Sequence, residues 1–316
     1  MNLPCKSIPE PASRAGFTLI ELCVVLAIVA VLAAVLLPAL ADTKPNTQAF
    51  QCLNNQRQIM LAWQMYAADN SDLLPPNDFY SGGAAPVQAW FGPKKGQCNW
   101  VGGGEDNRPN NTESTNTIML TAWAALGPYN TNAATYHCPS DTSVVTGVGP
   151  RIRSVSMNAA VGTIWNTART PGPPAKGDPV GQTWLSGSWS GSGLNNSIWR
   201  TYGTLGSMIR PTPSKLFVIT DENPFSINDP AFCVAMGTSA DANGNATSTI
   251  FVNVPGSYHN GAVTISFADG HSEIHKWLGK AVLISAGQLA NGIDCSGDSL
   301  SLGDLRWLQA RTTATK

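Results

Sequence analysis

An uninterrupted apolar run near the N-terminus constrains this chain more than any other feature. It extends from Leu22 to Ala41, twenty residues without a charged side chain. A helix rises about 1.5 Å per residue, so the run is long enough to cross the roughly 30 Å hydrocarbon core of a bilayer. One acid, Glu21, lies at its N-terminal end. An ionised side chain costs roughly 2.5–3.5 kcal/mol at mid-bilayer and less near the interface, so we expect this acid to have a function.

The residues before the apolar run resemble the class III signal peptide of type IV pilins and type II secretion pseudopilins. A short polar leader ends at Gly16, and Phe17-Thr-Leu-Ile-Glu21 follows. The resemblance implies cleavage after Gly16 by a prepilin peptidase and N-methylation of Phe17, with the apolar helix kept in the mature protein. A secretory signal peptide or a plain anchor helix is the alternative. The only small-residue cleavage site after the run is Ala39-Leu40-Ala41.

Composition narrows the class of the remaining chain. Charged residues make up 12% of the 316 residues and the net charge is −1, so no basic surface predicts a nucleic-acid partner. Ten Trp, 30 Gly and 22 Pro indicate a loop-rich body that leans towards β structure. These features favour an exported protein of one or two domains after the helix.

The cysteines also point to export. Cys5 lies in the leader and Cys23 in the apolar run, which leaves five others, Cys98 among them. An oxidising compartment predicts two disulfides and one free thiol, although the spacing does not decide the pairing. No two cysteines are close in sequence, so the spacing predicts no zinc site. The disulfide candidates are Cys52, Cys138, Cys233 and Cys295, with Cys52–Cys138 the first choice because it would tie a helix to the head.

The chain reads as an α+β protein in four segments. A leader at 1–16 and a membrane helix at 17–41 precede an amphipathic continuation of the helix at 42–70. A β-rich globular head follows at 71–316. Apolar residues recur at helical spacing in the continuation, although Gln56 and Arg57 interrupt their face. That face consists of Phe50, Leu53, Met60, Trp63 and Ala67.

The clearest β signals lie late in the chain. Residues 215–220 form an apolar run that ends in acids, as a central strand would. Residues 262–267 alternate, and Asp269-Gly270 predicts a two-residue type I′ turn that returns the chain along 271–277. This hairpin, within 259–277, is the best-supported β element. The sequence also predicts short helices at 118–126 and 301–310, and a strand at 151–157.

A second resemblance rests on the spacing of His259 from Asp269-Gly270. This H-x9-DG arrangement is similar to that of a prepilin-type family of large pseudopilin-like proteins. Further blocks that look like this family lie at 52–70, 136–141, 153–162, 221–229 and 257–277. The resemblance implies a pilin-like fold, in which the long first helix packs on a head with an antiparallel sheet. It also implies a membrane-anchored subunit of a pilus-like fibre and supplies no activity for the head.

Two metal sites can be drawn from the residues. Hard cations bind several oxygens at about 2.3–2.6 Å in flexible loops, and a calcium ion is the expected cofactor, if any. Its candidate ligands are Asp221, Glu222 and Asp229, beside Asn223 and Asn228, with Asp241, Asn243 and Asn245 as a competing cluster. Ordinary turn chemistry is the favoured explanation of both clusters.

A second candidate metal site is the run His271, Glu273 and His275, which shares one strand face. Residues on one face of a strand repeat about every 6.8 Å, so the two histidines would be about 13 Å apart and could not share a zinc ion. A polar solvent-facing strand is the favoured interpretation. A hydrolytic triad built on His259 and Asp269 lacks the G-x-S-x-G motif, so we expect no enzyme activity.

The leading hypothesis is therefore a structural fibre subunit of a type II secretion-like or type IV pilus-like system. Glu21 would neutralise the methylated amine of Phe17 on a neighbouring copy. The expected location is the inner membrane, crossed once, with the head in the periplasm or at the cell surface. The expected partners are the prepilin peptidase and related subunits. The alternative is a pilin-anchored binding module, in which a tryptophan-rich loop at 184–199 holds a glycan.

Overall fold

The computed structural model describes residues 18–77, 99–103, 112–163, 185, 198–284 and 292–316, with the backbone alone over 33–46. The chain divides into two compact units, Met1–Lys44 and Pro45–Lys316. One long helix, α1 (Leu19–Asp69), contributes residues to both units. The leader, including the predicted processing residues Gly16 and Phe17, lies outside the described residues.

The first unit consists, where it is described, of the N-terminal part of α1. Thr18 precedes the helix, and its backbone N–H and hydroxyl both donate to the Glu21 carboxylate at 2.9 and 2.7 Å. The Glu21 N–H donates back to the Thr18 hydroxyl at 3.3 Å, which completes a capping box. Every side chain from Thr18 to Leu32 is exposed. Over the described residues, no helix meets the length and apolarity needed to cross a membrane.

The helix is continuous through the junction between the apolar run and its amphipathic continuation. Residues of α1 have helical backbone through both Pro38 and Pro45. The helix ends at Asp69, where Ser71 and Asp72 adopt positive φ of 57° and 70° and turn the chain away. Pro75 and Pro76 follow shortly after, as is common beyond the end of a helix.

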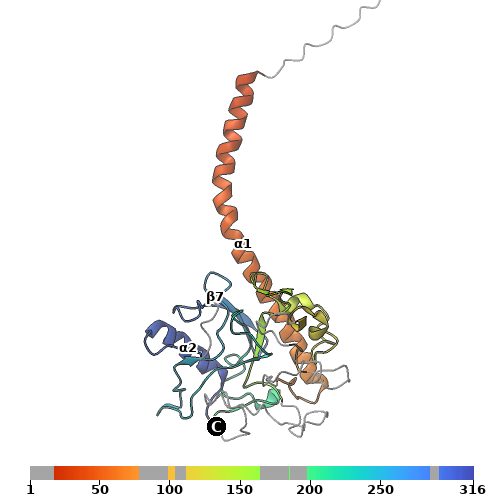
Figure 1. The fold of residues 1–316 in the computed structure, drawn as a ribbon, viewed down its shortest axis with the longest axis vertical. Coiled ribbons are helices and arrows are strands. Elements are labelled where there is room, and N and C mark those ends of the chain that lie inside the picture. Colours follow the sequence, from red (N-terminus) through yellow and green to blue (C-terminus); the bar gives the residue numbers. More distant parts are fainter. Residues whose placement is uncertain (1–17, 78–98, 104–111, 164–184, 186–197, 285–291) are drawn as a thin grey trace, which may run out of the picture. The chain divides into compact units, whose positions relative to one another are not determined.

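The head unit is built around a mixed sheet of five strands in the order β5-β3-β4-β7-β8 (Figure 1). Strands β3 and β5 are parallel, whereas the other neighbouring strands are antiparallel. The central strand β4 carries the predicted acids at its C-terminal end. The sheet strands are β3 (Val155–Asn158), β4 (Phe217–Asp221), β5 (Ala231–Phe232), β7 (Ala262–Phe267) and β8 (Ser272–Lys276).

Short elements and one further helix complete the described head. Two small antiparallel pairs, β1 with β2 and β6 with β9, lie outside the main sheet. The small strands are β1 (Val144–Val145), β2 (Gly149–Pro150), β6 (Ile250–Phe251) and β9 (Ile293–Asp294). The 3-10 helices are η2 (Thr112–Thr115), η3 (Thr117–Leu120), η4 (Ala133–Tyr136) and η6 (Leu205–Ser207). The C-terminal helix is α2 (Ser299–Thr312).

The two helices cover opposite faces of this sheet. Gln56 of α1 hydrogen-bonds the Ser266 hydroxyl, which places α1 on the face that Thr264 and Ser266 share. His275, which pairs with Val263 on the opposite face, stacks on Trp307 of α2 at a ring-centroid distance of 3.6 Å. In Figure 1, β7 accordingly lies between α1 and α2.

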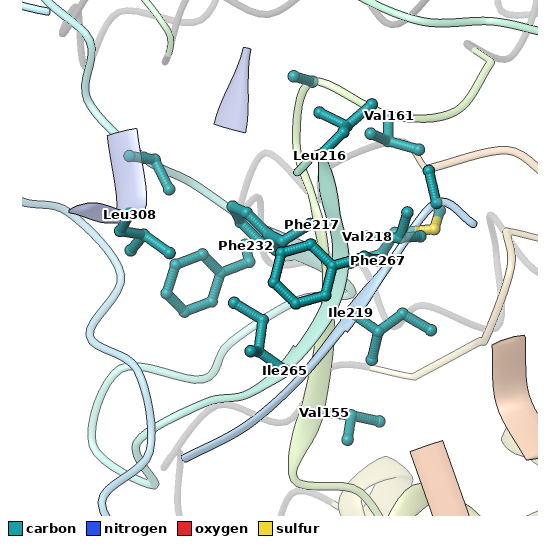
Figure 2. Packing of buried hydrophobic residues seen from close by; sticks show 14 of the residues in the cluster. Val155, Val161, Leu216, Phe217, Val218, Ile219, Phe232, Ile265, Phe267 and Leu308 are labelled. Carbon is teal, nitrogen blue, oxygen red and sulfur yellow. The ribbon is translucent and has the colours of Figure 1, made fainter. Parts of the chain in front are cut away.

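Apolar side chains fill the space between the sheet and α2. Figure 2 shows Phe217, Phe232 and Ile265 gathered beside Leu308 of α2. The rings of Phe217 and Phe232 meet edge to face at a centroid distance of 6.1 Å, an arrangement that stabilises aromatic pairs. All four side chains are inaccessible to solvent, so this cluster forms the core on the α2 side.

The predicted hairpin is present, but its turn differs from the prediction. A type I′ turn needs positive φ at both central residues, and of Asp269 and Gly270 only Gly270 has it, at 94°. The Gly270 N–H donates to the Phe267 carbonyl at 2.8 Å, and the Phe267 N–H donates to the His271 carbonyl at 2.9 Å. This is a three-residue loop with a glycine bulge. Asp269 stabilises it by accepting from the His271 N–H at 3.1 Å.

The sequence predicted some of the smaller elements correctly and others wrongly. The predicted strands at 215–220 and 151–157 correspond to β4 and β3, and the predicted helix at 301–310 corresponds to α2. The predicted helix at 118–126 is wrong, because only the 3-10 helix η3 and turns occupy that region. The Asn116 side chain accepts from the Ile118 N–H and starts this short turn, which does not propagate.

Candidate functional site

Four chemically reactive side chains converge beside the C-terminal end of β4. They are Cys52, Cys138, Asp221 and His259, and one potential ligand atom from each lies within 4.8 Å of those of the others. All four are buried, with exposed fractions of 1%, 1%, 0% and 7%. We call this group the four-residue cluster. Each member comes from a different part of the chain, so tertiary folding alone assembles it.

The helix contributes a polar stripe to this cluster. Gln48, Cys52 and Gln56 recur every fourth residue and so share one face of α1. The Cys52 thiol and the Gln56 amide both donate to Asp221 Oδ2 at 3.0 Å. Gln56 also donates to the Thr264 carbonyl, which attaches the helix to β7. The interruption of the apolar face at Gln56 is thus a buried hydrogen-bonding position.

Cys138 lies in the loop after η4, and a serine orients it. The Ser154 hydroxyl accepts from the Cys138 backbone N–H at 2.8 Å and donates to Asp221 Oδ1 at 2.8 Å. One hydroxyl therefore positions two members of the cluster. The Cys138 sulfur lies 3.5 Å from His259 Nε2.

His259 lies in the tight loop that precedes β7. Its backbone exchanges hydrogen bonds with Ala262, and Asn260 and Gly261 adopt positive φ of 53° and 77° between them. The second ring nitrogen, Nδ1, lies 3.4 Å from the Ser140 hydroxyl. That hydroxyl donates to Gln48 of α1. The imidazole is thus oriented from one side while its Nε2 atom faces the cysteines.

The spacing of His259 from Asp269-Gly270 does not reflect a contact. His259 precedes β7 and Asp269-Gly270 follows it, so the six residues of β7 separate them. The interval is set by the length of the strand, with the cluster at one end and a glycine turn at the other.

Burial perturbs the ionisation of the cluster. It raises the pKa of Asp221 to about 7, although hydrogen bonds from Cys52 and Ser154 partly oppose this. The hydrogen bond with Cys138 and burial raise the pKa of the Cys52 thiol well above its usual range. Burial lowers the pKa of His259. Each shift disfavours the charged form, so the cluster concentrates acids in a region that does not solvate their anions.

The predicted calcium ligands do not share one site. Asp221 faces α1, whereas Glu222 accepts hydrogen bonds from Ser226 and Asn253 on the opposite side of the extended chain. Asp229 accepts from the Ala231 N–H at 2.8 Å, as a turn-forming aspartate does. In the competing cluster, Asp241 accepts from Asn243 and Asn245 at 2.8–3.0 Å in the same way.

The disulfide candidates are free thiols in this structure. Cys52, Cys138, Cys233 and Cys295 are all buried and unbonded to one another. The first-choice pair, Cys52 and Cys138, does meet, but as half of the four-residue cluster. Cys98 and Cys5 lie outside the described residues. The predicted Cys52–Cys138 disulfide is therefore not formed in this structure, where the two thiols lie close together with Asp221 and His259.

Other candidate residues have separate partners. His271 stacks on Phe267 and contacts the Asp269 carboxylate, whereas His275 stacks on Trp307. These two histidines are engaged separately, as the strand spacing predicted. Of the tryptophan-rich loop, Trp199 is described, and it is 1% exposed with its indole N–H donated to the Gly237 carbonyl at 2.7 Å. This ring is not available to a glycan.

The four-residue cluster carried little signal in the sequence. Its members are spread from residue 52 to residue 259, so no short spacing relates them. One usable signal was Gln56, a polar residue on an otherwise apolar helical face that also carries Cys52. Only the pairing of β3, β4 and β7 brings the remaining members to that face.

Comparison with known proteins finds one match, to a motif near the N-terminus. Residues 11–37 match the prokaryotic N-terminal methylation motif. Neither the curated proteins nor the solved structures include a match to the chain. The motif implies processing by a prepilin peptidase and assembly with other pilins, and it covers Gly16, Phe17 and Glu21. On this evidence the chain carries the N-terminal segment of a pilin- or pseudopilin-type precursor.

Proposed function

We propose that this protein is a membrane-anchored structural subunit of a type IV pilus-like or type II secretion-like fibre. The observation that carries the proposal is the methylation motif at 11–37, joined to the apolar start of α1. Cleavage after Gly16 would leave Phe17 as the first mature residue. The helix would then remain attached to the head, as a fibre subunit requires.

The exposed apolar side chains support this proposal. From Leu19 to Leu32 the helix exposes leucine, isoleucine and valine side chains, with Leu19 81% and Val31 64% exposed. Burying one such side chain stabilises by roughly 1.5–3 kcal/mol, so an apolar environment is strongly favoured for this segment. Lipid before assembly and neighbouring helices after assembly would each supply one.

Glu21 would have one role before assembly and another in the assembled fibre. In the single subunit its carboxylate accepts two hydrogen bonds from Thr18 and caps the helix. In the fibre it would neutralise the methylated ammonium of Phe17 on a neighbouring copy, because an unpaired charge in an apolar layer is costly. The capping box holds the carboxylate at the start of α1, close to where the mature chain would begin.

Mass spectrometry of the native protein tests the proposal. We expect an N-methylated N-terminus at Phe17. Gly16→Val should leave the unprocessed precursor in the membrane, whereas Ala12→Val, which places the same side chain earlier in the leader, should be processed normally. A native N-terminus at Met1 or Asp42 would contradict the proposal.

A further inference from the structure

We propose that the four-residue cluster is a structural zinc site, with Cys52, Cys138, Asp221 and His259 as its ligands. This inference goes beyond the fibre role and does not depend on it. Zinc in structural sites takes four nitrogen, sulfur or oxygen ligands in a tetrahedron, and two cysteines, a histidine and a carboxylate supply such a set. The four ligand atoms lie within 4.8 Å of one another.

The distances suit a tetrahedral ion after small shifts of the ligands. With zinc bonds of about 2.3 Å to sulfur and about 2.0–2.2 Å to nitrogen or oxygen, neighbouring ligand atoms would be roughly 3.3–3.8 Å apart. The Cys138 sulfur lies 3.5 Å from His259 Nε2, and the Cys52 sulfur lies 3.0 Å from Asp221 Oδ2. Closing the widest pair from 4.8 Å would require a shift of about 1 Å.

The surrounding groups resemble the outer shell of a metal site. A metal-ligating histidine is usually held through its other ring nitrogen, and Ser140 contacts Nδ1 of His259 at 3.4 Å. Ligating carboxylates are in turn hydrogen-bonded, and Ser154 holds Oδ1 of Asp221 at 2.8 Å. These contacts leave Nε2 and Oδ2 directed towards the two sulfurs.

Electrostatics also favours a cation here over a purely hydrogen-bonded cluster. Cys52, Cys138 and Asp221 are acids buried together, and the donors to Asp221, namely Cys52, Gln56 and Ser154, are all neutral groups. A divalent ion would compensate the charge of the deprotonated ligands, which burial otherwise disfavours. A Cys52–Cys138 disulfide would use the two sulfurs and leave Asp221 without its thiol donor.

The proposed ion would tie α1 to the head. Cys52 belongs to the helix, while the other ligands lie after η4, at the end of β4 and before β7. A single bound ion would therefore join four segments that are distant in sequence. Because it would be absent from the unfolded chain, its binding should stabilise the folded head.

Metal analysis of the full-length protein, purified in detergent without added metal or chelator, tests the proposal. We expect about one zinc ion per chain, as a single four-ligand site requires, and chelation should lower the melting temperature. Cobalt(II) added to the metal-free protein should give the thiolate charge-transfer and d–d absorption of a tetrahedral site. Calcium added in excess should not compete with cobalt.

Matched variants locate the ion. Cys52→Ser and Cys138→Ser should abolish the cobalt absorption, whereas Cys233→Ser and Cys295→Ser, at buried cysteines outside the cluster, should retain it. Ser140→Ala should weaken zinc binding by about 10–100-fold through the histidine. Ser143→Ala is the control in the same loop, because its hydroxyl has no hydrogen-bond partner among the described residues.

The wild-type protein alone can refute the proposal, so the test does not depend on variants that fold. Wild-type protein that binds no stoichiometric zinc or cobalt overturns the proposal. So does a Cys52–Cys138 disulfide found by peptide mapping of the native protein without reduction. Unchanged cobalt absorption in Cys52→Ser would also refute the assigned ligands. None of these outcomes bears on processing at Gly16, so the fibre proposal is tested separately.

Discussion

The two ends of α1 make opposite use of the same helical backbone. Near its start, every side chain from Thr18 to Leu32 is exposed, although most are apolar. Near its end, Ile59, Met60 and Trp63 are fully buried, and so is the polar side chain of Gln56. In a soluble protein, the more apolar end of a helix would be expected in the core. Here the more apolar end is exposed, and the more polar end is packed in the head.

This difference separates two tasks. The first part presents apolar surface that this chain does not cover in the described residues, which suits contact with lipid or with other subunits. The second part belongs to the head, where helix and sheet share both an apolar core and a buried polar cluster. Substitutions in the first part should therefore affect assembly, and those in the second should affect folding.

Substitution of Glu21 should give the largest effect on assembly. We expect Glu21→Ala to abolish incorporation into fibres, since the neighbouring Phe17 ammonium would lose its partner at a cost of about 3–5 kcal/mol if well buried. Glu21→Asp should restore part of it. The melting temperature of the head and the cleavage after Gly16 should be unchanged. Recovery of sheared fibres and intact-mass analysis measure these results.

The capping box makes a sharper control possible. Glu21→Gln keeps an acceptor for Thr18 but removes the charge, and Thr18→Val removes the cap but keeps the charge. Charge neutralisation predicts that Glu21→Gln fails and that Thr18→Val assembles. The reverse result would assign the role of Glu21 to helix capping and remove the proposed mechanism.

Gln56 tests whether the polar stripe of α1 stabilises the head. Gln56→Ala should destabilise the protein by about 2–4 kcal/mol, because it removes three buried hydrogen bonds, to Asp221, Thr264 and Ser266. Gln58→Ala, at an exposed position of the same helix, should change the stability by less than about 0.5 kcal/mol. Chemical denaturation of both variants measures the difference. Equal effects would mean that Gln56 is not a structural link.

Two leucines compare the ends of α1 by the same chemical change. Leu53 is 8% exposed and Leu26 is 59% exposed. Leu53→Ala should destabilise the head by about 2–3 kcal/mol through the cavity it creates. Leu26→Ala should leave the denaturation midpoint of the head unchanged. A comparable loss for Leu26→Ala would show that the first part of the helix stabilises the head.

Gly270 tests the hairpin that faces α1. Gly270 has a positive φ of 94°, which a residue with a side chain rarely adopts. An added β-carbon would also lie 2.9 Å from the Gln64 amide nitrogen of the helix. Gly270→Ala should therefore cost about 1–2 kcal/mol, mostly from the left-handed backbone conformation. Gly297→Ala is the control, because nothing lies within 4 Å of its added β-carbon. Thermal unfolding that does not distinguish the two would contradict the turn geometry.

His275 gives the smallest expected effect and probes the sheet face away from α1. Burial lowers its pKa and the nearby Arg311 charge adds to this, with Asp304 opposing. The unfolded chain then binds the proton more readily, so this contribution to stability is present above about pH 6.5 and is lost as the pH falls below it. His275→Phe should reduce the loss of stability between about pH 6.5 and pH 5. An unchanged pH profile would contradict this.

The parts of the fold that were predictable are those with local physical causes. The hairpin at 262–276 followed from alternation and a glycine turn, and α2 followed from helical spacing. The turn type was wrong, because Asp269 and Gly270 alone do not determine how many loop residues join β7 and β8. The helix predicted at 118–126 was wrong because the backbone of Thr121 leaves the helical conformation, at φ −121° and ψ −80°, and ends the 3-10 helix η3 at Leu120.

The candidate sites also differ in whether local sequence or tertiary packing brings their residues together. The processing motif and Glu21 lie within a few residues of one another, so the sequence alone was sufficient to recognise the methylation motif at 11–37. The calcium prediction grouped Asp221 with Glu222 by proximity in sequence, and the strand separated them, because successive side chains point to opposite sides.

By itself, then, the sequence determined the N-terminal motif, the apolar run, the principal hairpin and the acids at the end of β4. Each depends on neighbours in the chain or on a period of two or about four residues. Only the tertiary structure decided that Cys52, Cys138, Asp221 and His259 meet, because the pairing of β3, β4 and β7 and the packing of α1 on that sheet set distances that no sequence spacing records.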